Sequence, residues 1–88
     1  MQRAALRERR QFAAKIRAAR AILRWSQAEL AERIGLTQRS INRLEQSEVD
    51  VRRSTMVAIE IVLKAEGISF EAQPDGGFRI IMADRRAR

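Results

Sequence analysis

The twenty residues from Gln27 to Gln46 constrain the fold most strongly, because they predict two short helices joined by a tight turn. Gly35 lies where the chain must reverse, and a positive φ costs little there only for a residue without a Cβ. Ala31, four residues earlier, is small enough to let the two helix backbones approach. The apolar residues that should form the inward stripe of each helix are Leu30, Ile34, Leu36, Ile41 and Leu44.

Capping residues place the ends of these helices. Ser26 and Glu29 have the S-x-x-E spacing of a capping box, which predicts that a helix begins at Gln27. Thr37 follows the turn and can accept a hydrogen bond from the first turn of the next helix, over about residues 38–45.

This segment resembles the helix-turn-helix of the phage repressor and Cro family, the xenobiotic-response-element type of bacterial regulators. The preceding residues 15–25 are similar to the first helix of that family, and the resemblance covers residues 11–66. It implies a compact, mainly α domain of four or five helices whose third helix reads DNA bases, and a role in repressing or activating transcription.

The helix over residues 38–45 should present a donor-rich face opposite its apolar stripe. Glutamine matches N6 and N7 of adenine, and arginine matches O6 and N7 of guanine. The resemblance implies base contacts by Gln38, Arg39 and Arg43. The competing interpretation is an ordinary solvated face. We predict base contacts by Gln38, Arg39, Asn42 and Arg43.

A second set of residues is predicted to contact phosphates. Gln27 opens a helix whose free N–H groups and positive dipole end attract anions, and its side chain can add a donor. The resemblance implies phosphate contacts by Ser26, Ser40 and Arg53 as well. Such contacts orient the protein on DNA without reading sequence.

Three other residues have structural interpretations. The family commonly pairs an arginine of the first helix with a glutamate that ends the third, which implies an Arg20–Glu45 ion pair here. Trp25 is predicted to be a core residue rather than a base-stacking one.

The overall charge agrees with a polyanionic partner. The net charge is +7, and sixteen of the eighteen basic residues are arginine, although a biased genome composition would give the same excess. The chain has no cysteine, and no apolar run is longer than Met56 to Ile59. We therefore expect a cytoplasmic protein without a membrane span.

The chain divides into three parts. Residues 1–10 form a basic N-terminal extension, either a solvated tail or a groove-binding arm. Residues 11–67 form the helix-turn-helix domain, in which residues 47–53 are a loop and a fourth helix runs over about 54–66 to Gly67. Residues 68–88 form a β-hairpin and a basic tail.

The hairpin is predicted from alternating apolar residues at 68–72 and 78–82 around a Pro-Asp-Gly-Gly turn. Its apolar face needs a partner surface, either the fourth helix or a second protomer. Val57 and Ile61 lie off the core stripe of Met56, Ile59 and Leu63, so they also need a cover. We predict a homodimer whose interface contains Val57, Ile61, Ile68, Phe70, Phe78 and Ile80.

Catalysis finds little support, because the chain has no His, Cys or Tyr. We therefore predict no enzyme activity, no cofactor and no metal. A divalent-cation loop at Glu45, Glu48 and Asp50 is the alternative to a solvated loop, but the spacing of an EF-hand is absent.

Two classes of function fit these observations. The first is a sequence-specific regulator of double-stranded DNA, either a Cro-like repressor or the antitoxin half of a toxin pair. The second is a protein-interaction module that uses the same fold and docks a partner on its apolar hairpin. The donor-rich residues 38–43 favour the first, whereas Glu48 and Asp50 beside phosphates favour the second.

Overall fold

The computed structural model describes residues 2–83 of the 88-residue chain, with side chains from Leu6 onward. The described part is mainly helical with a C-terminal hairpin, which confirms the predicted fold class. The basic tail predicted at the C-terminus, residues 84–88, lies outside the described residues. The elements are α1 (Gln2–Leu23), α2 (Gln27–Ile34), α3 (Gln38–Glu45), α4 (Arg53–Ala65), β1 (Ile68–Ala72) and β2 (Phe78–Met82).

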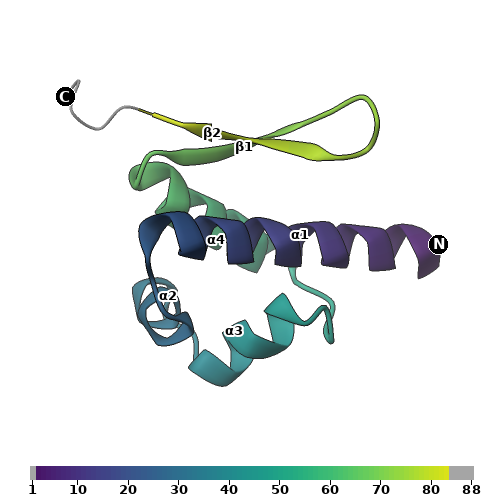
Figure 1. Cartoon of the computed structure of the whole chain (residues 1–88). Coiled ribbons are helices and arrows are strands. Elements are labelled where there is room, and N and C mark those ends of the chain that lie inside the picture. Colours follow the sequence, from purple (N-terminus) through teal and green to yellow (C-terminus); the bar gives the residue numbers. More distant parts are fainter. Residues whose placement is uncertain (1, 84–88) are drawn as a thin grey trace.

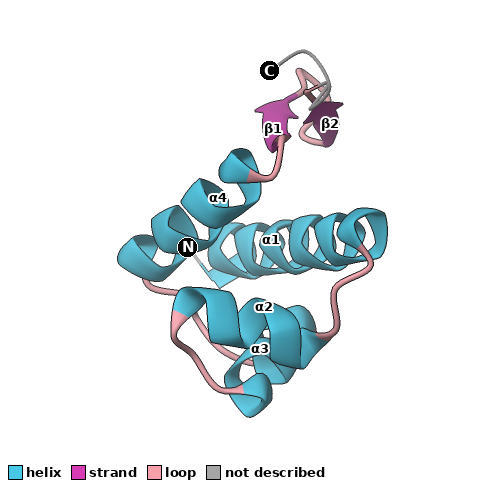
Figure 2. Cartoon of the chain, turned by 90° about the vertical axis from the view of Figure 1, so that its left-hand side faces the viewer, coloured by secondary structure: helices cyan, strands magenta, loops and turns pink. Residues whose placement is uncertain are grey.

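The elements form three layers (Figures 1 and 2). The helix pair α2 and α3 lies on one side of α1, and the hairpin lies on the opposite side. The fourth helix, α4, crosses the middle layer beside α1 and leads directly into β1. This arrangement leaves α3 at one outer edge of the molecule.

The core lies where the three layers meet. Its fully buried aliphatic side chains come from every layer, which explains why the short helices α2 and α3 are held in place despite having only eight residues each. The largest of these side chains are Ile16, Leu30, Ile41, Ile59, Leu63 and Ile68. Trp25 also belongs to the core, as predicted, and the Arg33 guanidinium lies 4.1 Å from the centre of its ring.

Local signals set the helix ends as the sequence predicted. Ser26 Oγ accepts a hydrogen bond from the Glu29 amide, and the Glu29 carboxylate accepts one from the Ser26 amide. Gly35 has φ of +74°, the left-handed conformation expected at the turn. Thr37 Oγ1 accepts from the Ser40 amide and caps α3.

The fourth helix lies one residue earlier at each end than the approximate range predicted, residues 54–66. The Met56 amide donates to the Arg52 carbonyl, so the helical hydrogen bonds start one residue earlier than expected and α4 begins at Arg53. Arg53 therefore belongs to the first turn of the helix rather than to the preceding loop. At the other end, Glu66 is the capping residue and Gly67 follows with φ of +88°.

The hairpin packs on its own chain. β1 and β2 are antiparallel, with Phe70 opposite Ile80 and Ala72 opposite Phe78. The rings of Phe70 and Phe78 meet edge to face at 5.9 Å, and Lys15 Nζ of α1 lies 5.5 Å and 5.6 Å from their centres. The protomer therefore covers much of the hairpin's apolar face by itself.

Candidate nucleic-acid interface

The outward face of α3 carries exposed donors. Ile41 and Leu44 are buried against the core, which turns Gln38, Arg39 and Arg43 into solvent. Asn42, the fourth predicted base-contacting residue, is only half-buried because it lies at the boundary with α2. The helix therefore offers a row of amide and guanidinium groups on a firmly packed support.

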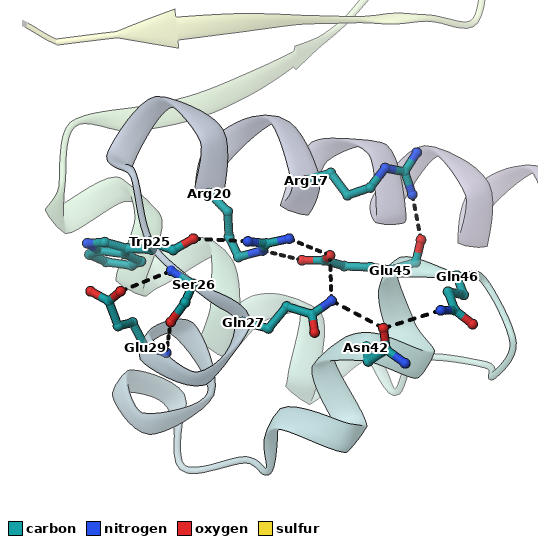
Figure 3. Close-up of polar contacts among 9 residues, drawn as sticks. All are labelled: Arg17, Arg20, Trp25, Ser26, Gln27, Glu29, Asn42, Glu45 and Gln46. Carbon is teal, nitrogen blue, oxygen red and sulfur yellow. Dashed lines mark hydrogen bonds and ion pairs between the residues drawn. The ribbon is translucent and has the colours of Figure 1, made fainter.

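A polar network joins α1, α2 and α3 behind this face (Figure 3). The Arg20 guanidinium contacts both carboxylate oxygens of Glu45, with Nη2 lying 2.8 Å from Oε1, and it also donates to the Trp25 carbonyl. Arg17 donates to the backbone carbonyl of Glu45 at the C-terminal end of α3. Two cations of α1 thus hold the end of the exposed helix.

Glu45 is the charged group on which this network depends. Its side chain is 4% exposed, whereas that of Arg20 is 22% exposed. Burial alone would raise the pKa of the Glu45 carboxyl, but hydrogen bonds from Arg20 and Gln27 and the charges of Arg20 and Arg17 together lower that pKa below its ordinary value. The hydrogen bond with Glu45 likewise raises the pKa of Arg20. The pair is therefore fully charged at neutral pH.

The structure uses the Gln27 side chain in a way that sequence reasoning missed. Its Nε2 donates to Glu45 Oε1 at 3.0 Å and to Asn42 Oδ1 at 3.3 Å. Both side-chain N–H groups are thereby used inside the protein, which leaves the backbone N–H of Gln27 as its donor for a phosphate. Only the family's Arg–Glu pairing pointed toward this region, and no local signal in the sequence predicts an amide link from α2 to α3.

The other predicted phosphate contacts lie at helix N-termini, where free backbone N–H groups gather. Ser26 caps α2, Ser40 lies in the first turn of α3, and Arg53 is the first residue of α4. All three side chains are exposed. Thr37 Oγ1 donates to Ser40 Oγ, so the Ser40 hydroxyl proton is still available to a phosphate oxygen.

Arginines accompany the acidic residues of the α3–α4 loop. Arg43 Nε lies 3.7 Å from Glu48 Oε2, and Arg9 Nε of α1 lies 3.4 Å from Asp50 Oδ1. Glu45 is occupied by Arg20, so each carboxylate of the alternative cation loop faces a different arginine. These contacts within the chain partly offset the negative charges of Glu48 and Asp50, whose side chains stay 50% and 83% exposed. The Arg9 contact also ties part of the predicted N-terminal extension to the domain.

The predicted dimer residues fall into two groups. Val57 and Ile61 are exposed on α4, at 45% and 63% respectively. Ile68, in contrast, is buried in the core, and the remaining three are half-buried against the rest of the chain: Phe70, Phe78 and Ile80. The hairpin's own packing removes Ile68 from the surface, which leaves the α4 residues as the most accessible part of the predicted interface.

Comparison with known protein families gives the same picture as this geometry. Within residues 2–83, no helix combines the length and apolar character that crossing a membrane requires. No curated protein sequence matches the chain significantly. Residues 16–67, more than half of the chain, match the helix-turn-helix family, a DNA-binding family rather than an enzyme family. With its capped α2, its glycine turn and its exposed α3, the chain belongs to the Cro/C1-type helix-turn-helix family of DNA-binding transcription regulators.

Proposed function

We propose that this regulator binds double-stranded DNA in a sequence-specific manner, with α3 in the major groove. The observation that carries the proposal is the exposed donor face of α3, which the ion pair between Arg20 and the buried Glu45 holds from behind. A rigid helix with exposed amides and guanidinium groups matches the hydrogen-bonding pattern of base edges. The residues proposed to contact bases are Gln38, Arg39, Asn42 and Arg43.

The phosphate contacts of the proposal come from three helix starts. The backbone N–H of Gln27 and the hydroxyl groups of Ser26 and Ser40 supply neutral donors, and Arg53 supplies a charged one. A cleft between α3 and α4 is lined by Ser40, Arg43 and Arg52 among others, although Asp50 lies there too. These groups would orient α3 in the groove and contribute affinity that falls with salt.

The proposed active species is a homodimer. One helix of eight residues reaches few bases, and helix-turn-helix proteins gain specificity by placing two such helices about 34 Å apart on a palindrome. The exposed apolar residues Val57 and Ile61 support a contact between two copies of α4. A Cro-like repressor and an antitoxin would share this arrangement, and for an antitoxin the second partner would be a toxin protein.

Selection from a pool of random duplexes tests the proposal. The wild-type chain should enrich one palindromic sequence, and its affinity for that duplex should exceed its affinity for a scrambled duplex of equal length by at least about 1,000-fold. Both affinities should fall steeply as salt rises. Equal affinity for the two duplexes would contradict sequence-specific binding and would favour the protein-interaction module.

A further inference from the structure

Asn42 can present two different chemistries to DNA, depending on how its side-chain amide is turned. One branch of the amide is an acceptor and the other carries two donors. With both branches free, asparagine matches adenine, which offers an N6 donor and an N7 acceptor. In this structure, the Asn42 oxygen accepts hydrogen bonds from both Gln27 and Gln46, and the nitrogen lies on the other branch of the amide, turned away from Gln27 (Figure 3).

The direction of this amide follows from the ion pair, one hydrogen bond at a time. Arginine can only donate and an ionised carboxylate can only accept, so Gln27 must turn its NH2 group toward Glu45. That same Nε2 lies 3.3 Å from Asn42. An Asn42 NH2 group in this position would place donor against donor, so Asn42 must present its oxygen to Gln27.

We infer that Asn42 is a donor-only reader of base edges, because the contacts that begin at Arg20 and Glu45 and pass through Gln27 fix its amide with Oδ1 inward and Nδ2 outward. Two outward N–H groups suit keto bases, since guanine O6 and thymine O4 accept hydrogen bonds. They suit adenine and cytosine less well, because adenine has its single acceptor, N7, beside an amino donor, and cytosine presents only an amino donor. Asn42 should therefore disfavour adenine, the base that a free asparagine prefers.

The first test needs no DNA. In the free protein, NMR should show that the Gln27 side-chain NH2 protons exchange slowly with solvent, because they are held by Glu45 and Asn42. The Asn42 side-chain NH2 protons should exchange quickly. Slow exchange of the Asn42 protons, with close contacts to the Gln27 side chain, would mean that the amide is turned the other way and would overturn the inference.

The second test rests on the proposed function and uses duplex selection. Asn42→Ala identifies the base pair that Asn42 reads, as the position whose preference becomes flat. Asn42→Asp keeps an oxygen toward Gln27 and Gln46 but replaces the donors by an acceptor, so it should reverse the preference at that base pair by about fivefold or more relative to wild type. Retention of the wild-type base by Asn42→Asp would overturn the inference, because an acceptor would then be the reading group.

Gln27→Met tests the orienting contact itself. Methionine has a similar length, cannot donate, and keeps the backbone N–H of residue 27. Freed from Gln27, the Asn42 amide can turn and bind adenine through both branches, so the share of adenine at that base pair should rise by about fivefold. The matched control is Gln46→Ala, since Gln46 is exposed and also donates to Asn42 Oδ1 but has no anchor at Glu45. It should leave the preference unchanged.

The outcomes separate the inference from the proposed function. If the wild-type chain enriches no sequence, the proposed function fails, while the exchange rates still decide how Asn42 is turned. If a sequence is enriched but no base pair depends on Asn42, the function stands and the donor-only reading fails. An unchanged share of adenine in Gln27→Met would show that Gln27 does not orient the amide.

Discussion

At the scale of single residues, the two arginines of α3 differ in how freely they can contact a base. Arg43 has a carboxylate partner in Glu48, and the side chains of both are 50% exposed. Arg39 is exposed and has no ion pair in the part of the chain that the structure describes. Substitution of Arg39 therefore tests base contact most directly. Arg43 instead tests whether Glu48 competes with DNA for its guanidinium.

Arg39→Ala should lower the affinity for the selected duplex by about 1–3 kcal/mol and relax the preference at one base pair, because a guanidinium that contacts guanine is lost. Titrations of the selected duplex and of its single-base variants measure both effects. Arg79→Ala is the control, since it removes the same charge from the exposed hairpin. If Arg39→Ala kept the full base pattern, Arg39 would not be a reader.

Glu48→Gln should strengthen binding to all duplexes by up to about 1 kcal/mol, because it frees Arg43 and removes a negative charge near the phosphates. The gain should shrink as salt screens the charges. Glu71→Gln makes the same charge change on the hairpin, at an exposed carboxylate that also has an arginine partner, Arg79, and controls for net charge. A gain confined to one base pair, or equal gains from both variants, would argue against release of Arg43.

At the scale of elements, α3 depends on α1 through Arg20 and Glu45. Arg20→Ala should destabilise the fold by up to about 3 kcal/mol, because it leaves the buried Glu45 carboxylate without its main partner. Glu45→Ala should cost less, since Arg20 remains partly exposed to water. Denaturant unfolding of both single variants and of the double variant measures the coupling. Simple additivity would mean that the two side chains contribute independently.

The same pair predicts an acid limit to stability. The pKa of Glu45 is lowered by folding, so its contribution is complete at pH values above about 4.3, the ordinary value for a glutamate, and is lost as the pH falls through the lowered pKa. The free energy of unfolding, measured across this range, should therefore fall with acid more steeply in wild type than in Glu45→Gln. Parallel profiles would show that Glu45 is not the responsible group.

Most element boundaries could be predicted from the sequence because their causes are local. A capping box at Ser26, a left-handed glycine at residue 35 and period-two alternation in the hairpin are each read within a few residues. The long-range polar contacts could not be predicted in this way. Arg9 reaches Asp50 and Gln27 reaches Asn42 only because α1, α2 and α3 pack as they do. The orientation of the Asn42 amide, which we propose reads a base, therefore depends on the packing of the helices.

At the scale of the whole molecule, the chain covers the inner face of the hairpin but leaves the outer side of α4 exposed. The hairpin closes on α1, where Gln11 donates to the Gly76 carbonyl and Lys15 lies against the two phenylalanine rings. The outer side of α4 has no such cover in the described chain, and Val57 and Ile61 stay exposed there. This contrast moves the proposed dimer contact toward α4 and away from the inner face of the hairpin.

The dimer prediction is tested by sedimentation at micromolar concentration. Wild type should sediment as twice the 10.1 kDa mass of the chain, and Ile61→Asp should sediment as a single chain, because a carboxylate in an apolar contact loses its water. Ile22→Asp, at an exposed position of α1, should stay dimeric. Circular dichroism melting shows whether each variant is folded.

A folded Ile61→Asp monomer should keep weak, salt-sensitive DNA affinity but lose preference for the palindrome, since one protomer reads only a half-site. A wild-type chain that sediments at 10.1 kDa would contradict the dimer and would leave the α4 surface to another protein.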